Sequence, residues 1–241
     1  MICCKARATA AAIAFSPKKS ISPFVTPMTP DLEATLDDYV LAHTTPPDAY
    51  LHRLYRATNL YLLRPRMASG HLQGQLLRML AQMHRPRTVV EIGTFSGYSA
   101  LALASGMQAG STVHTFEVND EQECFTRPWL EGAPYEARVV MHVGDVFELL
   151  PPMQLQVDMA FIDANKREYE AYYHLLMPMM HSGSVMLADN TLWDGHVVDS
   201  AYDRDAQTLA IRRFNDLVAD DPRVEQLILP ERDGLTLIRV K

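Results

Sequence analysis

The stretch Phe161-Ile162-Asp163-Ala164-Asn165-Lys166 contains the pattern that decides the fold of this chain. It begins with apolar residues typical of a buried strand and turns polar where a parallel strand would end. The stretch Leu187-Ala188-Asp189-Asn190-Thr191-Leu192-Trp193 repeats this pattern. Open α/β sheets bind ligands beyond the carboxyl ends of their parallel strands, so both stretches predict a ligand site at one end of such a sheet.

Strands and helices alternate on both sides of these stretches. We expect strands near 88–92, 112–117, 137–143, 159–162, 185–188, 224–229 and 235–240, and helices near 99–108, 120–131, 145–150, 168–180 and 203–220. This alternation predicts a Rossmann-like, doubly wound α/β sheet of seven mostly parallel strands. Only the short segment 230–234 separates the last two strands, so the last strand should be antiparallel.

The part of the chain before this sheet divides into two segments. Residues 1–28 are basic and contain no acidic residue, and their prolines interrupt any helix, so we expect a disordered leader. A transit peptide has a similar composition. Residues 29–86 should form a helical prelude, with helices near 29–43, 48–62 and 69–83, and residues 87–241 the Rossmann-like core of the same domain.

The composition is typical of a globular protein and excludes several classes. The chain is 48% hydrophobic and 21% charged, and no apolar run approaches the roughly 20 residues of a membrane span. The formal net charge of −7 argues against a dedicated duplex-DNA binder. Cys3 and Cys4 are adjacent and Cys124 is isolated, so we expect no disulfide framework and a cytoplasmic location.

The ends of the first three strands favour a nucleoside site. Gly93 and Gly97 flank a tight turn without the middle glycine of the dinucleotide fingerprint, which argues against a pyrophosphate and a nicotinamide dehydrogenase. Glu117 ends the second strand and suits ribose hydroxyls, and 144–147 offers an apolar wall for an adenine. The set favours S-adenosylmethionine, although each residue alone is compatible with an ordinary turn or a solvated acid.

The ends of the two quoted strands favour a metal. Asp163, Asp189 and Asn190 supply three oxygen ligands, which suit Mg²⁺ first and Ca²⁺ or Mn²⁺ as alternatives. Lys166 lies one short turn beyond Asp163, close enough to act on whatever the metal holds. Solvated strand ends are the competing interpretation, and the combination of three ligands with a lysine favours a site.

Taken together, these residues resemble the cation-dependent O-methyltransferases, a family that includes plant caffeoyl-coenzyme A methyltransferases and animal catechol methyltransferase. The resemblance covers about residues 50–241. It rests on four motifs, which are Val90-Glu91-Ile92-Gly93-Thr94 through Gly97-Tyr98-Ser99, Phe161-Ile162-Asp163-Ala164-Asn165-Lys166, Ala188-Asp189-Asn190-Thr191-Leu192-Trp193, and Asp233-Gly234-Leu235-Thr236.

The resemblance implies roles for individual residues. The divalent metal falls to Asp163, Asp189 and Asn190, and catalysis to Lys166 together with Asp163. S-adenosylmethionine falls to Ser69, Glu91, Gly93, Thr94, Ser99, Glu117, Val146 and Asp163, and the acceptor to Met67, Trp193 and Asp194. Asp194 stands where plant members that use coenzyme A thioesters carry asparagine, and the stretch before Met67 lacks their acceptor-binding arm. Both departures argue against a coenzyme A thioester acceptor.

A small catechol-type or phenolic acceptor is therefore expected, with two alternatives. Arginines 53, 56, 64 and 66 alternate with tyrosines 55 and 61, a pattern that also suits RNA, and some bacterial relatives methylate a hydroxylated tRNA uridine. The acidic net charge favours the small acceptor. A non-catalytic nucleoside-binding module is the other alternative, and the intact acids and lysine argue against it. The apolar first helices suggest a homodimer, as in many relatives.

Overall fold

The structure is a computed structural model that describes residues 30–241, with side chains from residue 35. The expected leader, 1–28, lies outside these residues. Backbone contacts divide the chain into two units, residues 1–43 and 44–241. The described part of the first unit is helix α1 (Pro30–Ala42). No helix in the described part of the chain has both the length and the hydrophobicity that a membrane crossing requires.

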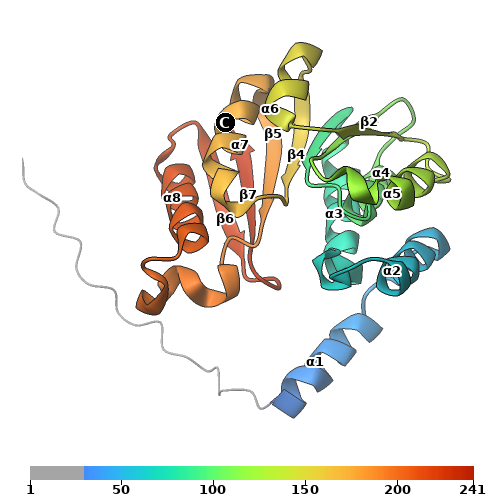
Figure 1. Cartoon of the computed structure of the whole chain (residues 1–241), viewed down its shortest axis with the longest axis horizontal. Helices are drawn as coiled ribbons and strands as arrows, with labels where there is room; N and C mark the ends of the chain where they lie inside the picture. Colours follow the sequence, from blue (N-terminus) through green and yellow to red (C-terminus); the bar gives the residue numbers. More distant parts are fainter. Residues whose placement is uncertain (1–29) are drawn as a thin grey trace, which may run out of the picture. The chain divides into compact units, whose positions relative to one another are not determined.

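The second unit is built on one seven-stranded sheet (Figure 1). Its strands are β1 (Thr88–Ile92), β2 (Thr112–Glu117), β3 (Arg138–Val143), β4 (Val157–Ile162), β5 (Met180–Asp189), β6 (Val224–Leu229) and β7 (Leu235–Val240). They lie in the order β3-β2-β1-β4-β5-β7-β6. Strands β1 to β5 pair in parallel, whereas β7 pairs antiparallel with both β5 and β6. The predicted Rossmann-like sheet with an antiparallel last strand is confirmed.

The helices follow the expected order with local differences. The second unit contains α2 (Ala49–Tyr61), α3 (Gly70–His84), α4 (Tyr98–Gly106), α5 (Glu123–Glu131), α6 (Val146–Leu149), α7 (Tyr169–Leu176) and α8 (Ala206–Asp220). The helix expected over 168–180 ends at Leu176, because Pro178 removes a backbone donor and a 3₁₀ turn follows. Strand β5 consequently begins at Met180, five residues earlier than expected, and reaches ten residues.

Alternating side chains give the sheet two buried faces. Val89, Met159 and Phe161 belong to the core beneath α2, α3, α4 and α5. Their neighbours Val90, Ala160 and Ile162 belong to the core beneath α6, α7 and α8. Helices therefore cover both faces, as a parallel sheet requires.

Helix α3 is integrated into this domain through close backbone packing on α4. A Cβ atom added at Gly106 would lie 2.3 Å from the carbonyl oxygen of Arg78, so only glycine fits at this crossing. The packing brings the beginning of α3, at Ser69, to the ligand end of the sheet. Residues 64–69, at the beginning of α3 and just before it, therefore form one wall of the site.

Candidate active site

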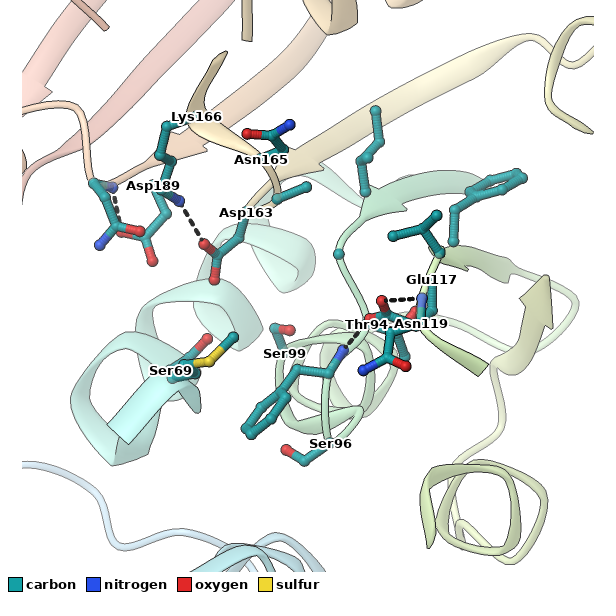
Figure 2. A pocket seen from close by; sticks show the side chains of 18 of the residues that line it. Ser69, Thr94, Ser96, Ser99, Glu117, Asn119, Asp163, Asn165, Lys166 and Asp189 are labelled. Atoms are coloured by element: carbon teal, nitrogen blue, oxygen red, sulfur yellow. Dashed lines mark hydrogen bonds and ion pairs between the residues drawn. The ribbon is translucent and has the colours of Figure 1, made fainter. Parts of the chain in front are cut away.

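One cavity of about 830 Å³ lies at the carboxyl ends of the parallel strands (Figure 2). It is centred where β1 and β4 are adjacent, the point at which the strand order reverses and open sheets bind ligands. Its walls come from the loops after β1 to β5, the 3₁₀ turn η1 (Pro65–Met67) with Ser69, and the β6–β7 turn.

The loop after β1 is held tightly against the loop after β4. Gly93 has φ +99°, and its N–H donates to the carbonyl oxygen of Phe116 at 2.9 Å. A Cβ atom at Gly93 would lie only 2.0 Å from the carbonyl oxygen of Asp163. Gly97, at φ +81°, closes the turn by donating to the carbonyl oxygen of Thr94 at 2.8 Å. The two glycines therefore shape a loop whose backbone lies at the cavity wall.

Glu117 fixes this loop while facing the cavity. Its Oε2 accepts from the N–H of Phe95 and its Oε1 from the N–H of Asn119, both at 2.9 Å. At the end of β3, Asp145 caps α6 by accepting from the N–H of Phe147 at 2.8 Å, and Val146 lines the cavity beside it. The predicted cofactor residues Ser69, Gly93, Thr94, Ser99, Glu117, Val146 and Asp163 all line this one cavity.

Glu91 is placed differently, because its side chain is fully buried below the glycine loop and does not line the cavity. Its Oε2 accepts from the Thr115 hydroxyl at 2.5 Å, and that hydroxyl lies 2.6 Å from the Thr94 hydroxyl. Burial raises the pKa of Glu91 to about 8, against the lowering effect of the Ser99 and Thr115 hydroxyls. The structure therefore places Glu91 behind the loop, and direct contact with a cofactor stays a prediction.

Lys166 is the central cation of the other side of the cavity. Its Nζ donates to Asp163 Oδ1 at 2.9 Å and to the Tyr169 hydroxyl at 2.6 Å. Tyr169 is fully buried and donates to the carbonyl oxygen of Asp189 at 2.9 Å. Only 7% of Lys166 is exposed, so its ammonium has a fixed place between the two acidic loops (Figure 2).

Asp189 and Asn190 complete the acidic side. Asp189 is 3% exposed, and burial and the nearby charge of Asp163 raise the pKa of its carboxyl to about 6. Asn190 has φ +58° and lines the cavity, with its backbone N–H donating to Asp189 Oδ1 at 2.8 Å.

The oxygen atoms of Asp163, Asp189 and Asn190 are of the type that binds a hard cation, although only two of the three side chains are carboxylates. Among residues 35–241, no three or more histidine, cysteine, aspartate or glutamate side chains lie close enough together to hold a metal ion. Two close carboxylates with an amide oxygen are oxygen donors with excess negative charge, which Mg²⁺ prefers. The metal therefore stays a prediction that the residues support.

The residues predicted to border the acceptor separate in the structure. Met67 and Trp193 line the cavity. The Asp194 side chain is exposed outside it, and its backbone N–H donates to the carboxylate of Asp233 in the β6–β7 turn. The same turn accepts from Thr191 N–H through Gly234 O at 3.0 Å, so it braces the loop after β5.

Three residues of the site were not predicted from the sequence. Tyr169 opens α7 three residues beyond Lys166, and this spacing of about one turn is the signal that could have indicated their contact. Gln73 is fully buried on α3, where its Oε1 accepts from Arg232 Nη1 at 2.9 Å. Arg232 also donates to the carbonyl oxygen of Ser69, 163 residues away in sequence, and no local pattern indicates that contact.

Comparison with known proteins agrees with this geometry. The sequence model of the O-methyltransferase family matches residues 42–241. The chain is 33% identical to tricin synthase 2 of Oryza sativa subsp. japonica over 72% of this chain and 63% of that protein. It is 32% identical to caffeoyl-CoA O-methyltransferase of Mesembryanthemum crystallinum over 72% of each chain. The crystal structure of the Bacillus cereus O-methyltransferase in complex with SAH superposes with a TM-score of 0.79 at 30% identity, covering 86% of this chain and 97% of that one.

Proposed function

This chain belongs to the O-methyltransferase family and is an S-adenosylmethionine-dependent enzyme, and we propose that it methylates a hydroxyl of a small catechol-type acceptor with a divalent cation. One observation carries the proposal, which is the burial of Lys166 between Asp163 and Tyr169 beside the cofactor loop. The caffeoyl-CoA relative is named for an acceptor whose ring carries vicinal hydroxyls.

The cofactor side of the cavity would bind and orient the methyl donor. S-adenosylmethionine, when bound, supplies an electrophilic methyl group on a sulfonium. The Glu117 carboxylate is held by two backbone N–H groups and presents acceptor capacity for ribose hydroxyls. Val146 supplies an apolar wall, and the backbone at Gly93 allows close approach because no Cβ intervenes.

The acidic side would position and activate the acceptor. Asp163, Asp189 and Asn190 are the residues that would hold a divalent cation, whose charge favours the ionised form of a neighbouring hydroxyl. A phenol with an ordinary pKa near 10 is a poor nucleophile at neutral pH, so this help is needed. Bringing both reactants together in line contributes roughly 7 to 11 kcal/mol in favourable cases.

Lys166 would act on the hydroxyl that receives the methyl group. Asp163 and Tyr169 take two of its three hydrogen-bond directions, which leaves one for an acceptor in the cavity. As the O–CH₃ bond forms and the S–CH₃ bond breaks, the hydroxyl proton must leave. Lys166 Nζ either takes that proton or, as an ammonium, stabilises the oxyanion.

Transfer of labelled methyl from S-adenosylmethionine tests the proposal directly. Catechol, caffeate and bulk tRNA are offered in parallel, with Mg²⁺ or with a chelator. We expect metal-dependent label on the small phenols. Methyl transfer that continues in the presence of the chelator would contradict the proposed metal requirement. Label on tRNA alone would contradict the proposed small acceptor.

A tRNA acceptor is the second candidate, and the position of two arginines favours it. Arg64 and Arg66 are exposed and line the mouth of the cavity, where cationic side chains can contact phosphates. The formal net charge of −7 weighs against it. Binding of bulk tRNA that falls steeply between low and physiological salt would support this candidate.

We further propose a homodimer in which a second copy covers the apolar residues at the C-terminal end of α2 and just beyond it. Leu60, Tyr61 and Leu63 are 63%, 76% and 89% exposed, which is costly for large apolar side chains that stay in water. Sedimentation equilibrium of the full chain is expected to give twice the monomer mass. A monomer at tens of micromolar would contradict this proposal.

A further inference from the structure

We propose that Arg64, Arg66 and Arg232 bind an anionic substituent of the acceptor, so that the enzyme selects catechol-type molecules carrying a carboxylate or phosphate over neutral catechols. The inference rests on the proposed function and adds the acceptor's charge to it. All three arginines line the cavity together with Met67 and Trp193.

Two segments distant in sequence bring these arginines to the same side. Arg64 and Arg66 lie at the 3₁₀ turn that leads into Ser69. Arg232 lies in the β6–β7 turn and donates through Nη1 to the carbonyl oxygen of Ser69 and to Gln73 Oε1. Since Ser69 follows the first segment directly, its bond to Arg232 holds the two segments side by side at the cavity mouth.

None of the three guanidinium groups forms an ion pair within 4.0 Å among the described residues, although the charge of Arg232 lowers the pKa of the neighbouring Glu231 carboxyl against the larger raising effect of burial. Among residues 35–241, ion pairs within 4.0 Å involve other cations, and Lys166 is the one lining the cavity. Glu231, next to Arg232 in sequence, keeps both carboxyl oxygens buried without a hydrogen bond. The carboxylate of Glu117 is bonded to backbone N–H groups and that of Asp163 to Lys166. Unpaired positive charge therefore remains at the mouth.

The guanidinium group of Arg232 is held in a fixed orientation, but some of its hydrogen-bond donors have no partner among the described residues. Nη1 makes both of its hydrogen bonds, and no bond within the described residues engages Nε or Nη2. A guanidinium fork matches carboxylate and phosphate oxygens bidentately. Gln73, which is fully buried, fixes this orientation from below. The arginine is thus ordered before an anion arrives.

Backbone conformation supports a built site on both segments. Arg64 and Arg232 have φ values of +57° and +50°, in the left-handed region that non-glycine residues seldom adopt. Five of the eight non-glycine residues with positive φ in the described chain line this cavity. Such conformations gather at functional sites, which fits arginines held for a ligand and not merely for solubility.

The other residues that line the cavity indicate the shape and polarity of the rest of the acceptor. Met67 and Trp193 provide apolar contact for a flat ring, while the acidic side receives the vicinal hydroxyls. The preferred molecule is therefore a dihydroxylated ring with an anionic group at its other end. The anion has two possible sources, a free carboxylate or the phosphates of a larger ester.

The test compares matched acceptors that differ in charge. Caffeate, its neutral methyl ester and caffeoyl-coenzyme A are assayed by labelled methyl transfer, and their binding to the enzyme with S-adenosylhomocysteine and Mg²⁺ is measured by calorimetry. We expect an anionic acceptor to exceed the ester by about 10-fold or more in kcat/KM and in affinity. A phosphate source is indicated when only the coenzyme A ester shows this advantage.

Two variants locate the effect. Arg232→Gln should lower kcat/KM for the anionic acceptor at least 10-fold more than for the methyl ester, mainly through KM. Arg85→Gln is the matched control, because Arg85 is an exposed, left-handed arginine at φ +55° that lies before β1 and outside the cavity. It should leave the ratio between acceptors unchanged.

The outcomes separate this inference from the proposed function. Equal binding of caffeate, its ester and the coenzyme A ester would overturn the inference even when the ester is methylated normally. Charge-selective binding without any methylation would support the inference and count against the proposed function alone. Equal losses on all acceptors in Arg232→Gln would also overturn it, since a general structural role would explain them.

Discussion

The two sides of the cavity differ in how far the chain itself compensates their charged groups. On the cofactor side, the Glu117 carboxylate already accepts two backbone N–H groups, and the glycine loop is bonded to β2. On the acidic side, Asp163 and Asp189 lie close together with one lysine between them, and the pKa of Asp189 is raised to about 6. The first side is satisfied by its own chain, whereas the second has more negative charge than its chain compensates.

This difference favours a nucleoside on the first side and, as proposed above, a cation on the second. A side whose loop is already fixed by internal hydrogen bonds binds the nucleoside part of the cofactor with little rearrangement. A side with surplus buried negative charge gains stability when a cation binds. A substitution on one side should therefore leave ligand binding on the other side unchanged. The five predictions below run from the largest expected effect to the smallest.

Loss of the buried charge at Asp189 should be the most damaging change. We expect Asp189→Asn to reduce metal-stimulated turnover at least about 10³-fold, since a catalytic cation supplies several kcal/mol. Binding of S-adenosylhomocysteine by calorimetry should change less than about 3-fold. Asp216→Asn, an exposed aspartate on α8, is the control. Full turnover in folded Asp189→Asn protein would contradict the proposed role of this residue in holding a metal.

Removal of the lysine should affect chemistry more than binding. Lys166→Met is expected to lower kcat about 10²- to 10⁴-fold, the usual contribution of a positioned acid or base. The KM for the acceptor should change little, because the other residues of the cavity would still bind the acceptor. Arg167→Met replaces the adjacent exposed cation and serves as the control. An unchanged kcat in Lys166→Met would exclude the lysine from the reaction.

A methyl group at the seam between the two sides should destabilise the fold. Gly93→Ala would place Cβ 2.0 Å from the carbonyl oxygen of Asp163, so we expect a loss of roughly 3 kcal/mol or more in the free energy of unfolding. Gly183→Ala has a similar φ of +91° with no atom within 4 Å, and should cost only about 1 kcal/mol. Equal losses by denaturant titration would contradict the close contact.

Cofactor binding should depend on the Glu117 carboxylate, whereas metal binding should not. Glu117→Gln is expected to weaken S-adenosylhomocysteine binding about 10- to 100-fold, because hydrogen bonds to a charged group contribute about 1.5 to 3 kcal/mol. The Mg²⁺ affinity should stay within about 3-fold. Glu121→Gln, an exposed neighbour in sequence, is the control. A parallel fall in Mg²⁺ affinity would show that the two sides are not independent.

The buried Glu91 should make the free energy of unfolding depend on pH, and counted for each pH unit this is the smallest of the five expected effects. Burial raises its pKa to about 8 from an ordinary value of 4.5, so the folded protein retains a proton that the unfolded chain releases. Stability of the wild type should therefore fall relative to Glu91→Gln by about 1.4 kcal/mol per pH unit between about pH 5 and pH 7.5. The free energies of unfolding of both proteins, measured by denaturant titration across this range, check it. A constant difference would show that Glu91 titrates normally.

Local sequence patterns predicted most of the sheet and both sides of the cavity. Three of the strands that end at the site carry an acidic residue just beyond the last apolar position, so Glu117, Asp163 and Asp189 could be predicted to face the cavity from their places in the chain. Pairing in parallel then forces these ends together.

Contacts between distant segments were not predictable in this way. The buried carboxyl of Glu91 accepts from Thr115, which lies on the neighbouring strand β2, 24 residues further along the chain. The bond from Arg232 to Ser69 depends on how a hairpin turn meets a helix start 163 residues earlier. The early start of β5 followed from Pro178, whose effect competed with an otherwise helical pattern.

The brace between the β6–β7 turn and the loop after β5 has a consequence during protein synthesis. Thr191 is held by Gly234, 43 residues further along the chain, and β7 inserts between β5 and β6. At roughly 5 to 20 residues per second, a ribosome needs roughly 2 to 9 seconds to make the intervening chain. A nascent enzyme therefore carries its acidic loop without this brace for that interval.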